Sequence, residues 1–78
     1  MRLKPFDEIA LTADLPSGKF EKGTLGVVAD VLKNGEAYMV EFFAANGETL
    51  GVEILESRFV APASQFPFPV YSRKDSLI

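Results

Sequence analysis

The segment at residues 22–26 reads Lys-Gly-Thr-Leu-Gly and is the first candidate for chemistry in this sequence. A phosphate-binding loop needs glycines followed by Lys and Ser or Thr at the start of a helix, whose amide groups hold the anion. Here the lysine precedes the glycines, and residues 27–31 read Val-Val-Ala-Asp-Val, which favours a strand. We therefore expect Gly23 and Gly26 to serve backbone bending or close approach of strands, and not phosphate binding.

Carboxylates are the second candidate, because paired Asp and Glu residues serve general acid–base catalysis and bind divalent cations. Asp7 and Glu8 are neighbours, so in a strand they would point to opposite faces. Glu41 and Glu53 would lie on adjacent strands, but the sequence adds no third ligand or nucleophile. The chain also has no histidine and no cysteine, which removes the commonest metal ligand and the thiolate nucleophile. We expect no enzyme activity, no catalytic residue, no metal site and no cofactor.

Length and composition limit the class of protein. A chain of 78 residues forms one domain with a thin core, and its 47% hydrophobic content is typical of a folded chain. The net charge of −3 repels polyanions, so nucleic acid is an unlikely partner. The absence of cysteine, of an apolar signal region and of a membrane-length apolar run predicts a cytoplasmic protein.

The elements that must position any site are short β-rich runs separated by turn residues. We expect a first strand within residues 6–12, a long loop, a second strand at about 24–33, two further strands, one turn at 55–58 and a closing strand at 59–61. This order predicts an all-β fold, a small five-stranded SH3-like barrel over residues 1–61. Residues 62–78 would form an extended C-terminal tail, because their spaced prolines exclude a helix.

Two turn signals fix the expected strand register. Asn34 and Gly35 predict a two-residue type I′ hairpin turn. That turn pairs Val31 with Tyr38, Ala29 with Val40, and Val27 with Phe42. Gly47 predicts a three-residue loop with a G1 bulge. That loop pairs Phe42 with Leu50, Val40 with Val52, and Tyr38 with Ile54.

Four segments, residues 7–16, 22–28, 36–42 and 47–49, resemble a family of short bacterial proteins that is frequent in cyanobacteria and is described as a domain of unknown function. The resemblance covers roughly residues 6–61. It implies an SH3-like barrel and no catalytic residues. Genes of this family sometimes lie beside toxin-like genes, which implies an antitoxin or immunity role. The glycine and valine block at 23–28 also resembles the KOW motif of ribosomal and transcription-factor barrels.

The expected register leaves an unusually apolar outer face, which predicts a protein interface. Its outward residues would be Val28, Leu32, Ala37, Met39 and Phe43. The tail aromatics Phe66, Phe68 and Tyr71 also favour burial. They could dock on their own barrel, exchange between two copies in a dimer, dock on another protein or remain disordered. The predicted partner-binding residues are Val28, Leu32, Met39, Phe43, Phe66, Phe68 and Tyr71.

An RNA-binding function is the alternative hypothesis. Lys19, Lys22 and Lys33 would line one end of the barrel, and Tyr38 or a phenylalanine would stack on a base. Several acidic residues lie close to these lysines in the sequence and would cancel much of their field. The favoured hypothesis therefore remains a non-enzymatic domain that binds another protein or a second copy of itself.

Overall fold

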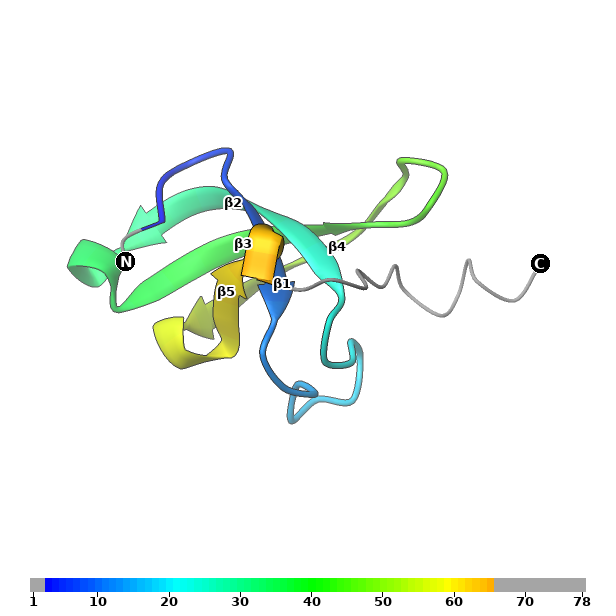
Figure 1. Ribbon diagram of the computed structural model, residues 1–78, viewed down its shortest axis with the longest axis horizontal. Helices are drawn as coiled ribbons and strands as arrows, with labels where there is room; N and C mark the ends of the chain where they lie inside the picture. Colours follow the sequence, from blue (N-terminus) through cyan, green and yellow to red (C-terminus); the bar gives the residue numbers. More distant parts are fainter. Residues whose placement is uncertain (1–2, 66–78) are drawn as a thin grey trace.

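The computed structural model describes residues 3–65 as one curled, five-stranded antiparallel sheet (Figure 1). The strands are β1 (Glu8–Leu11), β2 (Leu25–Leu32), β3 (Ala37–Phe43), β4 (Thr49–Glu56) and β5 (Val60–Pro62), and three single 3₁₀ turns are η1 (Lys33–Gly35), η2 (Ser57–Phe59) and η3 (Ala63–Gln65). The predicted all-β fold with five strands is confirmed. The tail at 66–78 lies outside the described residues, and so do the predictions for Phe66, Phe68 and Tyr71.

The sheet is open, because its edge strands do not pair with each other. The strand order is β4-β3-β2-β1-β5, with β5 bonded only to β1. β5 has three residues and ends at Pro62, which has no N–H to donate. The connection between β1 and β2 spans the gap and buries two of its side chains, Leu15 and Phe20. A loop, and not hydrogen bonds, therefore fills the seam between the two edges.

The concave side of the sheet holds a single apolar core. Its fully buried members include Ile9 and Leu11 of β1, Val28 of β2, and Val40 and Phe42 of β3. Thr24 is also fully buried, and its hydroxyl donates a hydrogen bond of 2.6 Å to the Glu21 carbonyl. Because that polar group is satisfied, it stabilises the entry to β2 without a desolvation penalty.

The first hairpin has the predicted turn. Asn34 and Gly35 both have positive φ values, 57° and 94°, and the Glu36 N–H donates to the Lys33 carbonyl over 3.1 Å. Val31 faces Tyr38, as predicted. The turn chemistry of the Asn-Gly pair therefore sets the register at this end of β2 and β3.

A β-bulge at Ala29 then shifts the register of β2 by one residue. Val28 pairs with Val40, and Val27 pairs with Glu41. The predictions that Ala29 and Val27 point inward are wrong. The prediction that Val28 points outward to a partner is also wrong, because Val28 is 0% exposed. One extra residue reverses the faces of every residue beyond it, since side chains in a strand alternate with a period of two.

The second hairpin also combines the predicted loop with a shifted strand register. Its loop has the predicted three residues, with Gly47 at φ 89° and the Ala44 N–H donating to the Glu48 carbonyl over 2.8 Å. Phe43 pairs with Thr49, but an irregularity at Leu50 then shifts the register. The observed pairs are Phe42 with Gly51, Val40 with Glu53, and Tyr38 with Leu55. The three predicted pairs beyond this loop are therefore wrong.

Both register shifts bring a glycine opposite Phe42. Gly26 and Gly51 flank Phe42 on the two neighbouring strands. A Cβ on Gly26 would lie 2.7 Å from Val40 Cγ1, which confirms the predicted close approach at this glycine. The Phe20 ring stacks on Phe42, with centroids 4.3 Å apart and an interplanar angle of 20°. The bulges place glycine on both sides of Phe42, and at Gly26 any other residue would clash.

Candidate protein-binding surface

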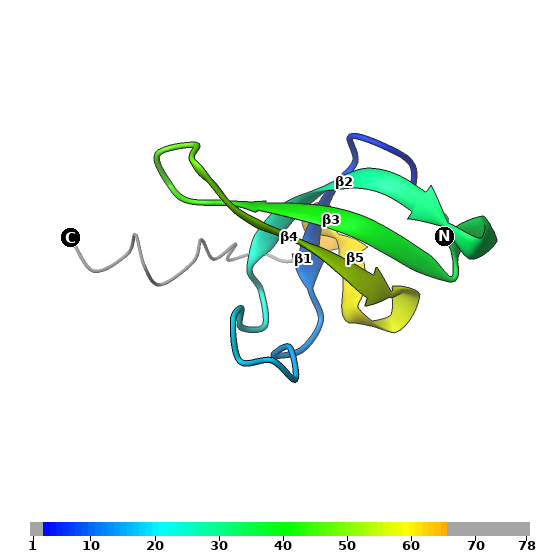
Figure 2. The same ribbon diagram turned by 180° about the vertical axis from the view of Figure 1, so that it is seen from behind.

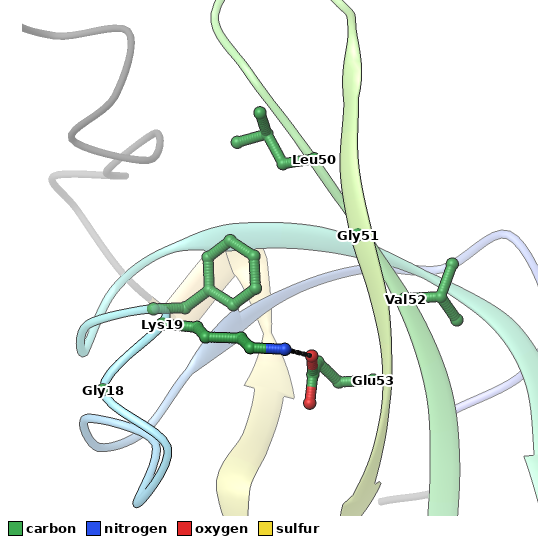
Figure 3. Close-up of a pocket in the computed structure, with 7 residues that line it drawn as sticks. Gly18, Lys19, Leu50, Gly51, Val52 and Glu53 are labelled. Carbon is green, nitrogen blue, oxygen red and sulfur yellow. Dashed lines mark ion pairs between the residues drawn. The ribbon is translucent and has the colours of Figure 1, made fainter.

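A groove follows β4 along the open seam of the sheet. Its first part has a volume of about 470 Å³ and lies between the loop residues Gly18–Phe20 and the strand residues Leu50–Glu53 (Figure 3). Its second part has a volume of about 250 Å³ and lies between residues 15–17, Phe59 and residues 53–56. Both parts share Glu53, so together they follow nearly the whole length of β4. We call this feature the β4 groove.

An ion pair crosses the β4 groove at its middle. The Lys19 Nζ lies 3.6 Å from a carboxylate oxygen of Glu53, and Figure 3 shows the two side chains meeting between the loop and the strand. Glu53 points inward because it pairs with the buried Val40. The Lys19 side chain is mostly exposed, and such a pair contributes about 0–1 kcal/mol to stability. The Lys19–Glu53 ion pair can therefore break at a small cost in free energy.

The convex side of the sheet carries a second candidate surface, which we call the outer face. Val27, Glu41 and Val52 form one row across β2, β3 and β4, and Met39 and Ile54 form the next row. Val52 is 50% exposed and Ile54 is 64% exposed. Figure 3 shows Val52 on the side of β4 away from the Lys19–Glu53 pair. Two large apolar side chains on an edge strand thus stand in solvent.

Negative charge dominates the sheet. Within residues 3–65 no strand carries a lysine or arginine, whereas the strands carry Glu8, Asp30, Glu41, Glu53 and Glu56. The cations of this part of the chain lie in loops and turns, and three of them form ion pairs: Lys4 with Asp7, Lys19 with Glu53, and Arg58 with Glu56. A ligand for this surface should therefore be apolar or positively charged.

One carboxyl group has a shifted pKa. The Lys4 backbone N–H donates to one oxygen of Asp7 over 2.9 Å, and Lys4 Nζ donates to the other over 3.0 Å. These hydrogen bonds to the charged form hold the pKa of Asp7 below its ordinary value of 3.8. They stabilise the turn before β1.

The predicted partner-binding residues are only partly brought together. Met39 lies on the outer face between Asp30 and Ile54, and it is half-buried, as Phe43 and Leu32 are. Ala37, also expected outside, is buried. The sequence reasoning missed Val52 and Ile54, because it placed both inside. Pairing Gly51 with Phe42 would have exposed them, and that glycine was the signal available in the sequence.

The lysines of the RNA hypothesis do not form one patch. Lys19 is paired with Glu53 in the loop before β2, and Lys22 follows in the same loop. Lys33 lies in η1, which Figures 1 and 2 place at the other end of the molecule. Tyr38 is buried in the core and so is not exposed for stacking on a base. Within residues 3–65 no three metal-ligating side chains cluster, and no helix there has the length and apolarity to cross a bilayer.

The comparison with known families agrees with the segments singled out in the sequence. Residues 6–60 match the family described as Domain of unknown function (DUF4926). The chain belongs to the DUF4926 family. No curated protein and no solved structure matches it. The matched residues run from the turn before β1 to the start of β5, so the DUF4926 segment includes the β4 groove and the outer face.

Proposed function

We propose that this DUF4926 chain is a non-enzymatic protein-binding domain that holds a partner on β4, through the outer face and the adjoining groove. The observation that supports it is the exposure of Val52 and Ile54 on an edge strand. Apolar residues exposed together on a monomer commonly mark an interaction surface. The unpaired side of an edge strand can also accept an extended segment by backbone hydrogen bonding.

The negative charge of the outer face supports a partner that carries basic residues. The rows of the outer face combine Val52, Ile54 and Met39 with the acidic residues Glu41 and Asp30. A partner segment of alternating apolar and basic residues would match both features. An antitoxin or immunity protein that neutralises a basic toxin-like protein, encoded by a neighbouring gene, fits this chemistry.

The proposal is tested by co-purifying the full chain with the protein encoded by the neighbouring gene. The double variant Val52→Asp with Ile54→Asp should lose at least about tenfold in affinity, because burying a Val or Ile side chain contributes on the order of 1.5–3 kcal/mol. The control is Phe6→Asp, since Phe6 is 87% exposed but lies outside the rows of the outer face.

Isothermal titration calorimetry measures each affinity, and circular dichroism shows whether each variant is folded. A folded Val52→Asp with Ile54→Asp variant that binds as tightly as wild type contradicts the proposal. Equal loss in the Phe6→Asp control also contradicts it.

A further inference from the structure

We propose that the C-terminal segment of this chain, residues 66–78, occupies the β4 groove and competes there with the partner. This inference rests on the proposed function in treating the groove as a docking surface. It adds a regulatory role for a segment that carries two phenylalanines, a tyrosine and two adjacent cations.

The groove offers an unpaired strand edge. Within residues 3–65 β4 pairs with β3 alone, so every second backbone N–H and C=O group of β4 faces away from β3. β4 contains neither lysine nor proline, which commonly protect such edges. Two other features can protect this edge from pairing with another strand: the irregularity at Leu50 and the inward-pointing charge of Glu53. An occupant that carries a cation can therefore pair with Glu53 when the Lys19–Glu53 ion pair opens.

The charge distribution favours the C-terminal segment. Residues 3–65 contain five Lys or Arg residues and ten Asp or Glu residues, so their side chains carry a net negative charge. Residues 66–78 contain two Lys or Arg residues and one Asp, so their side chains carry a net positive charge. The two cations of the segment, Arg73 and Lys74, are adjacent. Glu53 and Glu56 lie along the second part of the groove, so an extended segment can set its cations against them.

The same comparison excludes a second copy of β4 as the occupant. An antiparallel pair of two β4 strands joins two edges that both carry glutamates and no cation. Like charges on directly opposite residues destabilise a strand pair. The C-terminal segment introduces no such conflict, because its net charge is opposite.

The order of residues in the segment also fits. Phe66 and Phe68 alternate with Pro67 and Pro69, so in a β-extended backbone both rings would point to one side. Residues 70–74 read Val-Tyr-Ser-Arg-Lys and contain no proline. Whichever N–H groups face β4, every second one along the segment, can therefore donate to its edge. Residues 66–69 would place their aromatic rings in the groove, and residues 70–74 would pair with β4.

The segment is long enough to reach. Residues 70–74, which would pair with β4, lie five to nine positions beyond Gln65, so at about 3.3 Å per residue they can reach about 17–30 Å from it. The two shorter dimensions of the molecule are 23 Å, so this reach crosses much of the molecule. Tethering also raises the local concentration of the segment to about millimolar, so even a weak interaction fills the groove.

A spin label tests the proposal in the full chain. The sequence has no cysteine, so Ser72→Cys provides a single site for a nitroxide. We expect the amide signals of residues 51–55 and 18–20 to broaden more strongly than those of the turn at residues 4–7. That turn bonds to β2, which is two strands away from β4 in the sheet. Mixing spin-labelled chain with isotope-labelled chain that lacks the spin label should give no broadening, because the contact is within one molecule.

Charge reversal provides the second test. Arg73→Glu with Lys74→Glu should lower the docked population on the order of threefold per ion pair removed, and Glu53→Lys with Glu56→Lys should restore it. The inference would be overturned if the broadening showed no preference for β4, or if it also occurred in the mixed sample. It would also be overturned if charge reversal left the broadening unchanged. These outcomes leave the proposed function intact, since loss of partner binding in the Val52→Asp with Ile54→Asp variant is measured separately.

Discussion

Two glycines on either side of one ring provide a matched test of the observed register. Gly26 and Gly51 both lie opposite Phe42, on β2 and β4. A Cβ on Gly26 would lie 2.7 Å from Val40 Cγ1 and 3.0 Å from the Glu41 carbonyl oxygen. A Cβ on Gly51 would have one neighbour, the Phe20 ring at 4.0 Å. The same substitution should therefore have opposite effects at the two sites.

Gly26→Ala should lower the free energy of unfolding by about 1–3 kcal/mol, the usual cost of overpacking a core. In a domain of this size each kcal/mol lowers Tm by about 4–8 °C. Gly51 does not have a positive φ, so Gly51→Ala should raise the free energy of unfolding by about 0.4–1 kcal/mol. It does so by restricting the unfolded chain.

Urea unfolding followed by circular dichroism measures both values. The predicted register without bulges places neither glycine beside Phe42, so it gives no reason for the two variants to differ. Equal effects of Gly26→Ala and Gly51→Ala, or a more stable Gly26→Ala protein, would refute the account of the two shifts.

Three further outcomes are expected. Phe42→Ala should lower the free energy of unfolding by about 3–5 kcal/mol, measured in urea, because the ring is fully buried and stacked on Phe20; a loss under 1 kcal/mol would contradict the core described here. The pKa of Asp7 is lowered on folding, so its carboxylate stabilises the fold above pH 3.8 and ceases to do so as the pH falls through the folded value. Wild type should therefore have a higher Tm than Asp7→Asn at pH 6, and this difference should shrink as the pH falls below 3.8. Single-stranded RNA at low salt should give no mobility shift, since no described strand carries a cation; a salt-sensitive complex would instead support the RNA hypothesis.

Local signals in the sequence predicted the local structure well. The Asn34-Gly35 turn and the left-handed Gly47 appear where expected, because their backbone conformations depend on residues two or three positions apart. The number and order of strands follow from the same signals. The family resemblance carried by these segments is confirmed over residues 6–60.

Register depended on contacts that local signals do not contain. Ala29 and Leu50 are ordinary strand residues, and nothing in their own types marks an interruption of the ladder. Both interruptions bring a glycine opposite Phe42, and Gly26 is the one that leaves no room for a Cβ. These two glycines are 25 positions apart in the sequence. Alternation alone therefore assigned Val28 to the outside, and Val52 and Ile54 to the inside, whereas the structure has the opposite faces for these residues of β2 and β4.

The irregularity at Leu50 has a consequence for how such a domain changes over evolution. If Leu50 instead paired with Phe42, the ladder would alternate without a break. The valine and isoleucine of β4 would then point into the core, while Glu53 and Leu55 would turn to solvent. One bulge therefore separates two different molecular exteriors, with chain length and every amino-acid type unchanged. Relatives that share the same scaffold can thus differ in partner by gaining or losing this bulge.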